Sequence, residues 1–247
     1  MRAPEREDAE LNELKWWSKW GNLRRRGDGY LLTSEKLREP FFNRAGSLTC
    51  DGVPGAAAWA ERDLAPLGLS STVVVFDACG APKDLLASGY TETDTMTVLF
   101  SEGPVTKEGD QGAEVGTAND AGSWGSTYLR SFYGDEGLAG VLGPIVASLQ
   151  RDRDVTLLES RVKGETAGVL AIYRTPGMAG VYCVGTVPEQ RKRGVATGLL
   201  AEAREIASRE ERALVLQTLK SDGALALYLN RGFVPMYSKR VLEKKLR

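Results

Sequence analysis

The stretch GVYCVGTVPEQRKRGVATGLLAEAREIA, residues 180–207, decides the fold. Its first eight residues are apolar or small, which predicts a buried strand that Pro188 ends. Residues 193–209 then predict a helix with one apolar face, made of Val195, Leu199, Ala203 and Ile206. A strand, a basic loop and an amphipathic helix therefore follow one another without interruption.

The loop between them reads Arg191-Lys192-Arg193-Gly194-Val195-Ala196. Its small residues let the backbone approach a ligand closely. The first turn of a helix has unpaired N–H groups and the positive end of the helix dipole, which together suit a pyrophosphate. The loop lacks the spacing of a P-loop and of a dinucleotide-binding glycine motif. It therefore predicts a phosphate site of another kind.

Working outward, short strands and helices alternate on both sides of this stretch. Apolar alternation predicts a hairpin over 154–174 that turns near Lys163-Gly164, and a further strand over 213–218. The first half predicts helices over 5–20 and 54–66 and a buried strand over 72–77, while Arg24 to Arg26 read as a turn. Residues 101–112, SEGPVTKEGDQG, are the best linker candidate. The order predicts an α+β (α/β) fold with a mixed sheet.

The composition excludes several classes of site. The 247 residues include no histidine, which excludes Ser-His-Asp and Cys-His catalysis and most zinc sites. The three cysteines are scattered, so we expect neither a disulfide framework nor a metal site. No transmembrane or secretory segment is apparent, and a cytoplasmic protein that does not bind membranes is the expectation. Residues 113–247 carry 19 basic and 15 acidic side chains, which suits a small anion better than nucleic acid.

Two motifs then occur together. Val187-Pro188-Glu189 precedes Arg191-x-x-Gly194-x-Ala196, and Ala224-x-x-x-Tyr228-x-x-x-Gly232-Phe233 follows downstream. This pair resembles the GNAT superfamily of acyl-CoA-dependent N-acyltransferases, over residues 113–247. The resemblance implies a GNAT fold and acetyl transfer from acetyl-CoA, by direct transfer, to a primary amine of a small molecule.

The resemblance also implies roles for particular residues. Tyr228 would protonate the departing thiolate, for which a phenol with a pKa near 10 is suited. Backbone groups of Gly185 and Val187 would pair with the pantetheine arm, and the loop would hold the pyrophosphate. The residues expected to bind the cofactor are Gly185, Thr186, Val187, Arg191, Lys192, Arg193, Gly194, Val195, Ala196 and Ser221.

Two departures from the family pattern leave questions open. Ser221 stands near a position where an asparagine is common. The strand over 180–187 has no carboxylate, although some family members place a general base there. Several acidic residues could act through water instead, and the sequence does not choose among them: Asp120, Asp135, Glu136, Glu159 and Glu165. Cys183, without a histidine partner, is expected to be inert.

The first half repeats the order of the second, with TVVVFDACG and Leu85 to Tyr90 standing where ALVLQTLKSDG and Leu227 to Phe233 stand later. It lacks the basic loop, so we expect a degenerate GNAT-like unit over 1–108 and a catalytic domain over 113–247. Two alternatives remain: a CoA-binding or small-ligand-binding module without turnover, and a protein or peptide acetyltransferase. The acceptor, the general base and the oligomeric state are left open, and no metal is expected.

Overall fold

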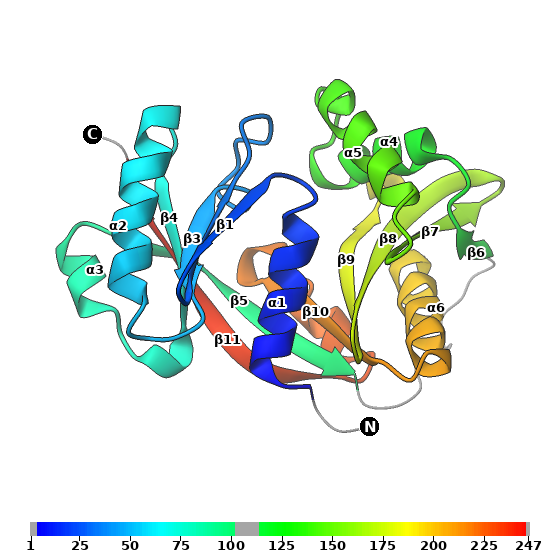
Figure 1. Ribbon diagram of the computed structural model, residues 1–247. Coiled ribbons are helices and arrows are strands. Elements are labelled where there is room, and N and C mark those ends of the chain that lie inside the picture. The colour runs from blue at the N-terminus through cyan, green and yellow to red at the C-terminus, as the bar shows by residue number, and fades with distance from the viewer. Residues whose placement is uncertain (1–3, 102–113, 246–247) are drawn as a thin grey trace. The chain divides into compact units, whose positions relative to one another are not determined.

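The computed structural model describes residues 4–101 and 114–245 (Figure 1). The chain folds into two compact units. Unit 1 comprises Met1–Pro4, Phe100–Leu216 and Tyr228–Val234, and unit 2 comprises Glu5–Leu99, Gln217–Leu227 and Pro235–Arg247. The predicted linker lies, apart from Ser101, outside the described residues.

Unit 2 is built on a mixed sheet with the strand order β1-β2-β3-β4-β11-β5. Helix α2 packs on β2, β3 and β4, where Ala45 and Val73 belong to its apolar core. Arg44, the neighbour of Ala45, contacts α1 instead, so α1 covers the opposite face. The elements of unit 2 are α1 (Arg6–Trp17), β1 (Asn22–Arg26), β2 (Gly29–Thr33), β3 (Arg44–Ser47), α2 (Val53–Leu64), η1 (Ala65–Leu67), β4 (Ser71–Phe76), η2 (Asp77–Cys79), α3 (Lys83–Ala87), η4 (Lys220–Asp222) and the greater part of β5 (Thr91–Ser101) and β11 (Phe233–Lys244).

Unit 1 contains the strand order β10-β9-β8-β7-β6. Gly168 on β8 faces α6, whereas Gly185 on β9, opposite the next residue of β8, faces α4. Helices α4 and α6 therefore cover opposite faces of this sheet, as Figure 1 shows. Its elements are β6 (Glu114–Thr117), α4 (Ala121–Phe132), α5 (Ala139–Gln150), β7 (Val155–Val162), β8 (Glu165–Thr175), β9 (Met178–Thr186), η3 (Pro188–Gln190), α6 (Val195–Arg209), the greater part of β10 (Ala213–Leu219) and the end of α7 (Leu225–Leu229).

The mixed α/β fold class predicted from the sequence is confirmed, and the order of elements repeats. From β1 to β5 the chain runs strand, strand, strand, α2, strand, η2, α3, strand, and from β7 to β11 the same order returns with α6, η4 and α7. The two series differ in the short helices η1, after α2, and η3, before α6. In each repeat the first two strand pairs are antiparallel and the third is parallel. That the first repeat is a degenerate GNAT-like unit stays a prediction. In unit 2 the last strand of the second repeat, β11, pairs with β4 of the first.

Helix α1 is held in unit 2 by a buried ionic cluster, defined by Glu10, Glu13, Arg44, Lys239 and Tyr237. Lys239 Nζ lies 2.8 Å from Glu10 Oε1 and 2.6 Å from Glu13 Oε2, and Arg44 Nη2 lies 2.5 Å from Glu13 Oε1. The four charged side chains are almost fully buried, and Tyr237 donates a hydrogen bond to Glu10. The cluster contains two cations and two anions, so its net charge in the core is zero.

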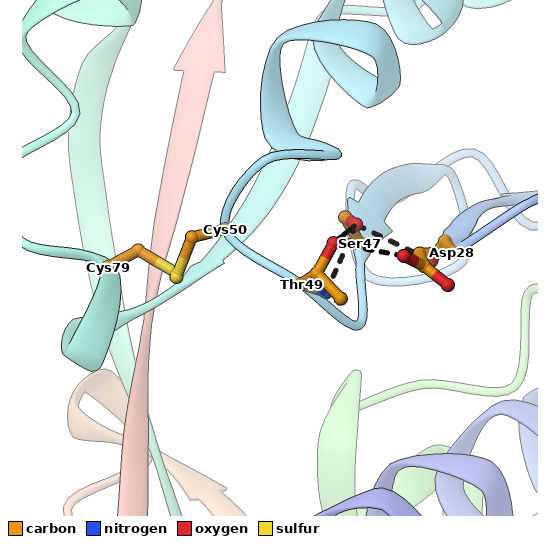
Figure 2. Close-up of a disulfide and its surroundings, with 5 residues drawn as sticks. All are labelled: Asp28, Ser47, Thr49, Cys50 and Cys79. Carbon is orange, nitrogen blue, oxygen red and sulfur yellow. Dashed lines mark hydrogen bonds between the residues drawn. A yellow bond between two sulfur atoms is a disulfide. The ribbon is translucent and has the colours of Figure 1, made fainter.

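A disulfide joins Cys50 to Cys79, with the Cα atoms 5.3 Å apart (Figure 2). From three scattered cysteines no disulfide framework is expected, and the sequence does not predict this single bond. Cys50 follows β3 and Cys79 follows β4, and these strands are parallel neighbours in which Ala45 is paired with Val73. Because parallel strands end at the same edge of a sheet, cysteines 29 residues apart in sequence meet there. On the other side of the Cys50 loop, Thr49 donates a hydrogen bond to Asp28 (Figure 2).

We predict that Lys239→Met destabilises the protein by about 3–5 kcal/mol, because removing one partner leaves buried carboxylates without their cation. Burial already raises the pKa of Glu10 in the wild type. Without Lys239 the folded-state pKa of Glu10 rises further above its unfolded value. The variant therefore loses stability as the pH rises and recovers part of it in acid. Urea unfolding at pH 5 and pH 8 measures both effects.

Lys244→Met on the same strand is the matched control. Lys244 pairs with Glu61 at 3.0 Å, but both side chains are partly exposed. Such a pair is worth roughly 0–1 kcal/mol, so its loss should have a small effect at both pH values. Equal destabilisation by the two substitutions would contradict the importance of the buried cluster.

Candidate functional site

The site predicted from residues 180–207 begins where β9 leaves β10. The parallel ladder between them runs from Met178–Ala213 to Val181–Leu216 and ends there, although β9 continues to Thr186. Cys183 has a φ of 55°, and the register with β8 shifts between Val169 and Ala171. This is a β-bulge, which bends the strand away from its former direction. Beyond Val181, β8 is the one described strand that pairs with β9.

The bulge decides which backbone groups face the side that β10 has left. Val187 donates its N–H to Ala167 of the β8 side at 3.0 Å. Because backbone groups alternate along a strand, those of Gly185 also face β8, and those of Val184 and Thr186 face away. The N–H of Val187 is therefore already engaged within unit 1, and the pairing of backbone groups of Gly185 and Val187 with a pantetheine arm stays a prediction. Val184 and Thr186 form the edge that β10 leaves, and at this edge the Thr186 carbonyl accepts a hydrogen bond from Arg191.

The C-terminal end of α4 packs directly on the end of β9. A Cβ atom at Gly185 would lie 2.9 Å from Ser131 Cβ and 3.0 Å from Phe132 Cε2, so only glycine fits this approach. Arg191 fastens the following loop to both elements: its Nε donates to the carbonyl of Thr186 at 3.2 Å and its Nη2 donates to that of Ser131 at 3.0 Å. Arg191 thus holds the loop in place with two of its donor atoms.

The loop leads into α6, whose first N–H groups have no partner within the helix. Lys192 and Gly194 have φ angles of 63° and 82°, a region that strains most L-residues. Gly194 is the N-cap, and in the described chain no side chain caps this helix. The Gly194 carbonyl accepts the N–H of Gly198 at 2.9 Å, so the N–H groups of Val195, Ala196 and Thr197 have no partner within the helix. Such a terminus is suited to an anion.

The remaining basic side chains of the loop, Lys192 and Arg193, are exposed. Arg193 Nη1 lies 3.4 Å from the side-chain oxygen of Gln190. An ion pair between Arg130 and Glu189 adds a further link between α4 and the start of the loop. The loop is therefore held by Arg191 and Glu189, while positive charge remains at its surface.

Tyr228 lies in unit 1 near the end of α7 and is 6% exposed. Its ring meets the edge of Phe233 at a centroid distance of 6.0 Å. On α6, Arg204 packs its guanidinium 4.9 Å from the centroid of Phe233. The part of the second motif from Tyr228 to Phe233 is thus attached, within unit 1, to the helix that follows the basic loop.

Ser221 lies in η4 and belongs to unit 2. Its Oγ donates a 2.5 Å hydrogen bond to Asp94 Oδ2 on β5, and its N–H donates to Oδ1 at 3.3 Å. Because its hydroxyl proton points at a carboxylate, Ser221 can offer further partners only its lone pairs. Sequence reasoning misses both Asp94 and Arg204, since no local motif marks either residue.

The acidic residues considered as general bases mostly have structural partners. Asp120 caps α4 by accepting the N–H groups of Ser123 and Gly122, which lowers its pKa. Glu159 is buried and accepts hydrogen bonds from Arg161 at 2.9 Å and Thr166 at 3.1 Å. Asp135 accepts the N–H of Gly137, and Glu136 accepts the hydroxyl of Ser126. Glu165 is exposed on the β7–β8 hairpin.

Two further observations concern metals and membranes. Within residues 4–101 and 114–245, no three or more acidic or cysteine side chains gather in a way that could hold a metal ion. No helix in these ranges has the length and hydropathy needed to cross a membrane. Burial raises the pKa of the Cys183 thiol well above its usual range, so this cysteine is a poor nucleophile at neutral pH.

Comparison with known proteins agrees with this geometry. No curated protein matches the chain in sequence. Among solved structures, a GCN5-related N-acetyltransferase from Kribbella flavida aligns with a TM-score of 0.71 at 17% identity, over 97% of this chain and 96% of its own. Another from Sphaerobacter thermophilus gives 0.68 at 18% identity, over 89% and 77%. At such identities the likeness shows the fold.

The sequence match to a family model is independent of that likeness. It covers residues 124–233, from Trp124 in α4 to Phe233 of the second motif, and the model describes the acetyltransferase (GNAT) family. Residues 124–233 thus form an acetyltransferase domain of the GNAT family.

Proposed function

We propose that the protein transfers an acetyl group from acetyl-CoA to a primary amine of a small molecule, by direct attack of the amine. The observation that carries the proposal is the continuity of two features: the edge of β9 that β10 leaves, and the uncapped α6 terminus that follows it along the chain. The first suits the amide groups of a pantetheine arm, and the second suits a pyrophosphate. Thr186 and Arg191 to Ala196 would contribute to holding acetyl-CoA, with Gly185 and Val187 shaping the strand end. A part for Ser221, which belongs to unit 2, stays a separate prediction from the sequence.

In the proposed reaction the amine nitrogen attacks the thioester carbonyl carbon and the carbon–sulfur bond breaks. Tyr228 would donate its phenol proton to the departing thiolate, and water would accept the proton that the amine loses. No carboxylate lies on β9, and four of the five acidic candidates already have partners. This favours proton removal by water.

The lack of a carboxylate on β9 that could act as a general base also favours a second candidate function, a module that binds CoA without turnover. Incubating the purified protein with acetyl-CoA and a panel of amines, while following free thiol, separates the two. Thiol release that depends on an amine supports the transferase, and the responding amines define the acceptor, including peptides. Micromolar CoA binding with no thiol release across the panel would support the binding module. Absence of CoA binding would contradict both.

A cytoplasmic location belongs to this proposal. Structural disulfides are rare in cytosolic proteins, so a cytoplasmic location requires that Cys50–Cys79 be reduced or transient there. Trapping the thiols in intact cells and counting modified cysteines tests this directly. Modification of Cys50 and Cys79 supports the location, and their protection contradicts it.

We predict that Gly194→Glu weakens CoA binding by more than tenfold, or about 1.4 kcal/mol. The substitution places a negative charge at the N-cap, where the pyrophosphate would bind, and it strains a backbone with a φ of 82°. Gly194→Gln is the matched control, because it brings the same strain and nearly the same size without the charge. Isothermal titration with CoA should give a weaker affinity for the glutamate than for the glutamine variant. Unchanged affinity in both would place the phosphates elsewhere.

We predict that Tyr228→Phe lowers kcat by about 10²–10⁴-fold and leaves the CoA affinity nearly unchanged, because it removes the proton donor and keeps the packed ring. Steady-state kinetics and a CoA titration measure the two quantities. Tyr237→Phe, which removes a phenol hydroxyl in unit 2, is the control and should retain the wild-type kcat. Near-normal turnover of Tyr228→Phe would refute the acid role. A parallel loss of CoA affinity would make Tyr228 a binding residue instead.

A further inference from the structure

Arg204 is a buried cation on α6 in unit 1. Its side chain is 5% exposed, and within the described residues it has no carboxylate partner. Burial lowers its pKa to about 10, as expected for a charge that is removed from water without an anion beside it. Burying a charge without an anion beside it costs free energy, which its other contacts must offset. The position of Arg204 on α6 therefore calls for an explanation other than stability.

The guanidinium contacts three consecutive residues of the second motif. Nη2 donates a hydrogen bond to the carbonyl of Arg231 at 2.9 Å. A Cβ atom at Gly232 would lie 3.7 Å from Nη1, so the group lies against that residue as well. The guanidinium carbon lies 4.9 Å from the ring centroid of Phe233, which is the geometry of a cation–π contact. One side chain of α6 thus holds residues 231–233 by three contacts.

Two of the residues that Arg204 contacts, Arg231 and Phe233, in turn contact Tyr228. Arg231, whose carbonyl Arg204 binds, donates its N–H to the carbonyl of Tyr228 at 3.0 Å. The ring of Phe233, against which Arg204 packs, contacts the ring of Tyr228, with the two centroids 6.0 Å apart and an interplanar angle of 74°. Helix α7 has five residues, and a helix this short depends on tertiary contacts for its position. The backbone and the ring of Tyr228 are therefore both supported by groups that Arg204 holds.

We propose that Arg204 is a positioning residue that fixes the Tyr228 phenol in its place for proton donation. The inference rests on the proposed function of Tyr228. Arg204 does not touch the reacting atoms in this scheme. It acts by limiting the positions that residues 228–233 can adopt, so its loss should reduce turnover more than it reduces affinity for CoA.

A double-mutant cycle tests this role, because it measures whether Arg204 acts through Tyr228. Arg204→Met keeps a long apolar stem and removes the charge, the hydrogen bond and the planar group. We expect it to lower kcat at least tenfold in the wild-type background and less than twofold in the Tyr228→Phe background. The affinity for CoA should change less than threefold in either background. Arg204→Lys, which keeps the charge over Phe233 and one donor, should restore part of the kcat and provides a second variant if the methionine protein does not fold.

The outcomes separate this inference from the function it rests on. If Tyr228→Phe is slow and Arg204→Met lowers kcat by the same factor in both backgrounds, Arg204 has only a structural role and the inference is overturned. A wild-type kcat in Arg204→Met would overturn it as well. If Tyr228→Phe itself turns over normally, the acid role of Tyr228 fails, and positioning by Arg204 fails with it. A cycle in which the Arg204 effect disappears without the phenol supports the proposal.

Discussion

The bulge at Cys183 is the constraint on which the site in unit 1 depends. Up to Val181 the strands β9 and β10 share a regular parallel ladder, and beyond it β9 pairs with β8 among the described strands. A bulge adds one unpaired residue to a strand and so changes the direction of the chain after it. Here it turns the backbone groups of Val184 and Thr186 away from β8, where the Thr186 carbonyl accepts a hydrogen bond from Arg191, and the chain continues to the α6 terminus at Gly194. The cysteine side chain has no chemical part in this, since burial keeps its thiol protonated.

A second constraint acts in unit 2, where the two halves of the sequence meet in one core. Strand β11 from the C-terminal half pairs with β4, and Lys239 on β11 lies between Glu10 and Glu13 of α1. A buried cation between two carboxylates accepts few alternative partners, whereas apolar contacts tolerate many. The ionic cluster therefore favours a single placement of α1 against β11. Asp94 and Ser221 add an exposed hydrogen bond between β5 and η4.

The parts that can be predicted are those determined by local sequence. The helix predicted over 193–209 begins at Val195, and the hairpin turns at Lys163-Gly164 as expected. Both follow from apolar spacing, and Gly164 adopts its positive φ without strain. Strand β1 reads as a turn in the sequence because Arg24 to Arg26 are exposed on an edge strand, where no alternation marks them. The disulfide depends on the parallel register of β3 and β4, which no short stretch of sequence encodes. Arg204 escapes prediction for a similar reason, since the carbonyl that it binds lies 27 residues further along the chain.

The loop of three basic residues shows how a motif divides its roles between side chains and backbone. Arg191 uses two of its donor atoms on the carbonyls of Thr186 and Ser131, so part of its hydrogen-bonding capacity maintains the loop. Lys192 contributes a positive φ and an exposed charge, and Arg193 lies beside Gln190. The groups that point out of the helix end are backbone N–H groups, which no mutation of a neighbouring side chain removes. An anion held in this way depends on the path of the chain through Gly194 more than on any one basic side chain, because a change of backbone angle there redirects several donors at once.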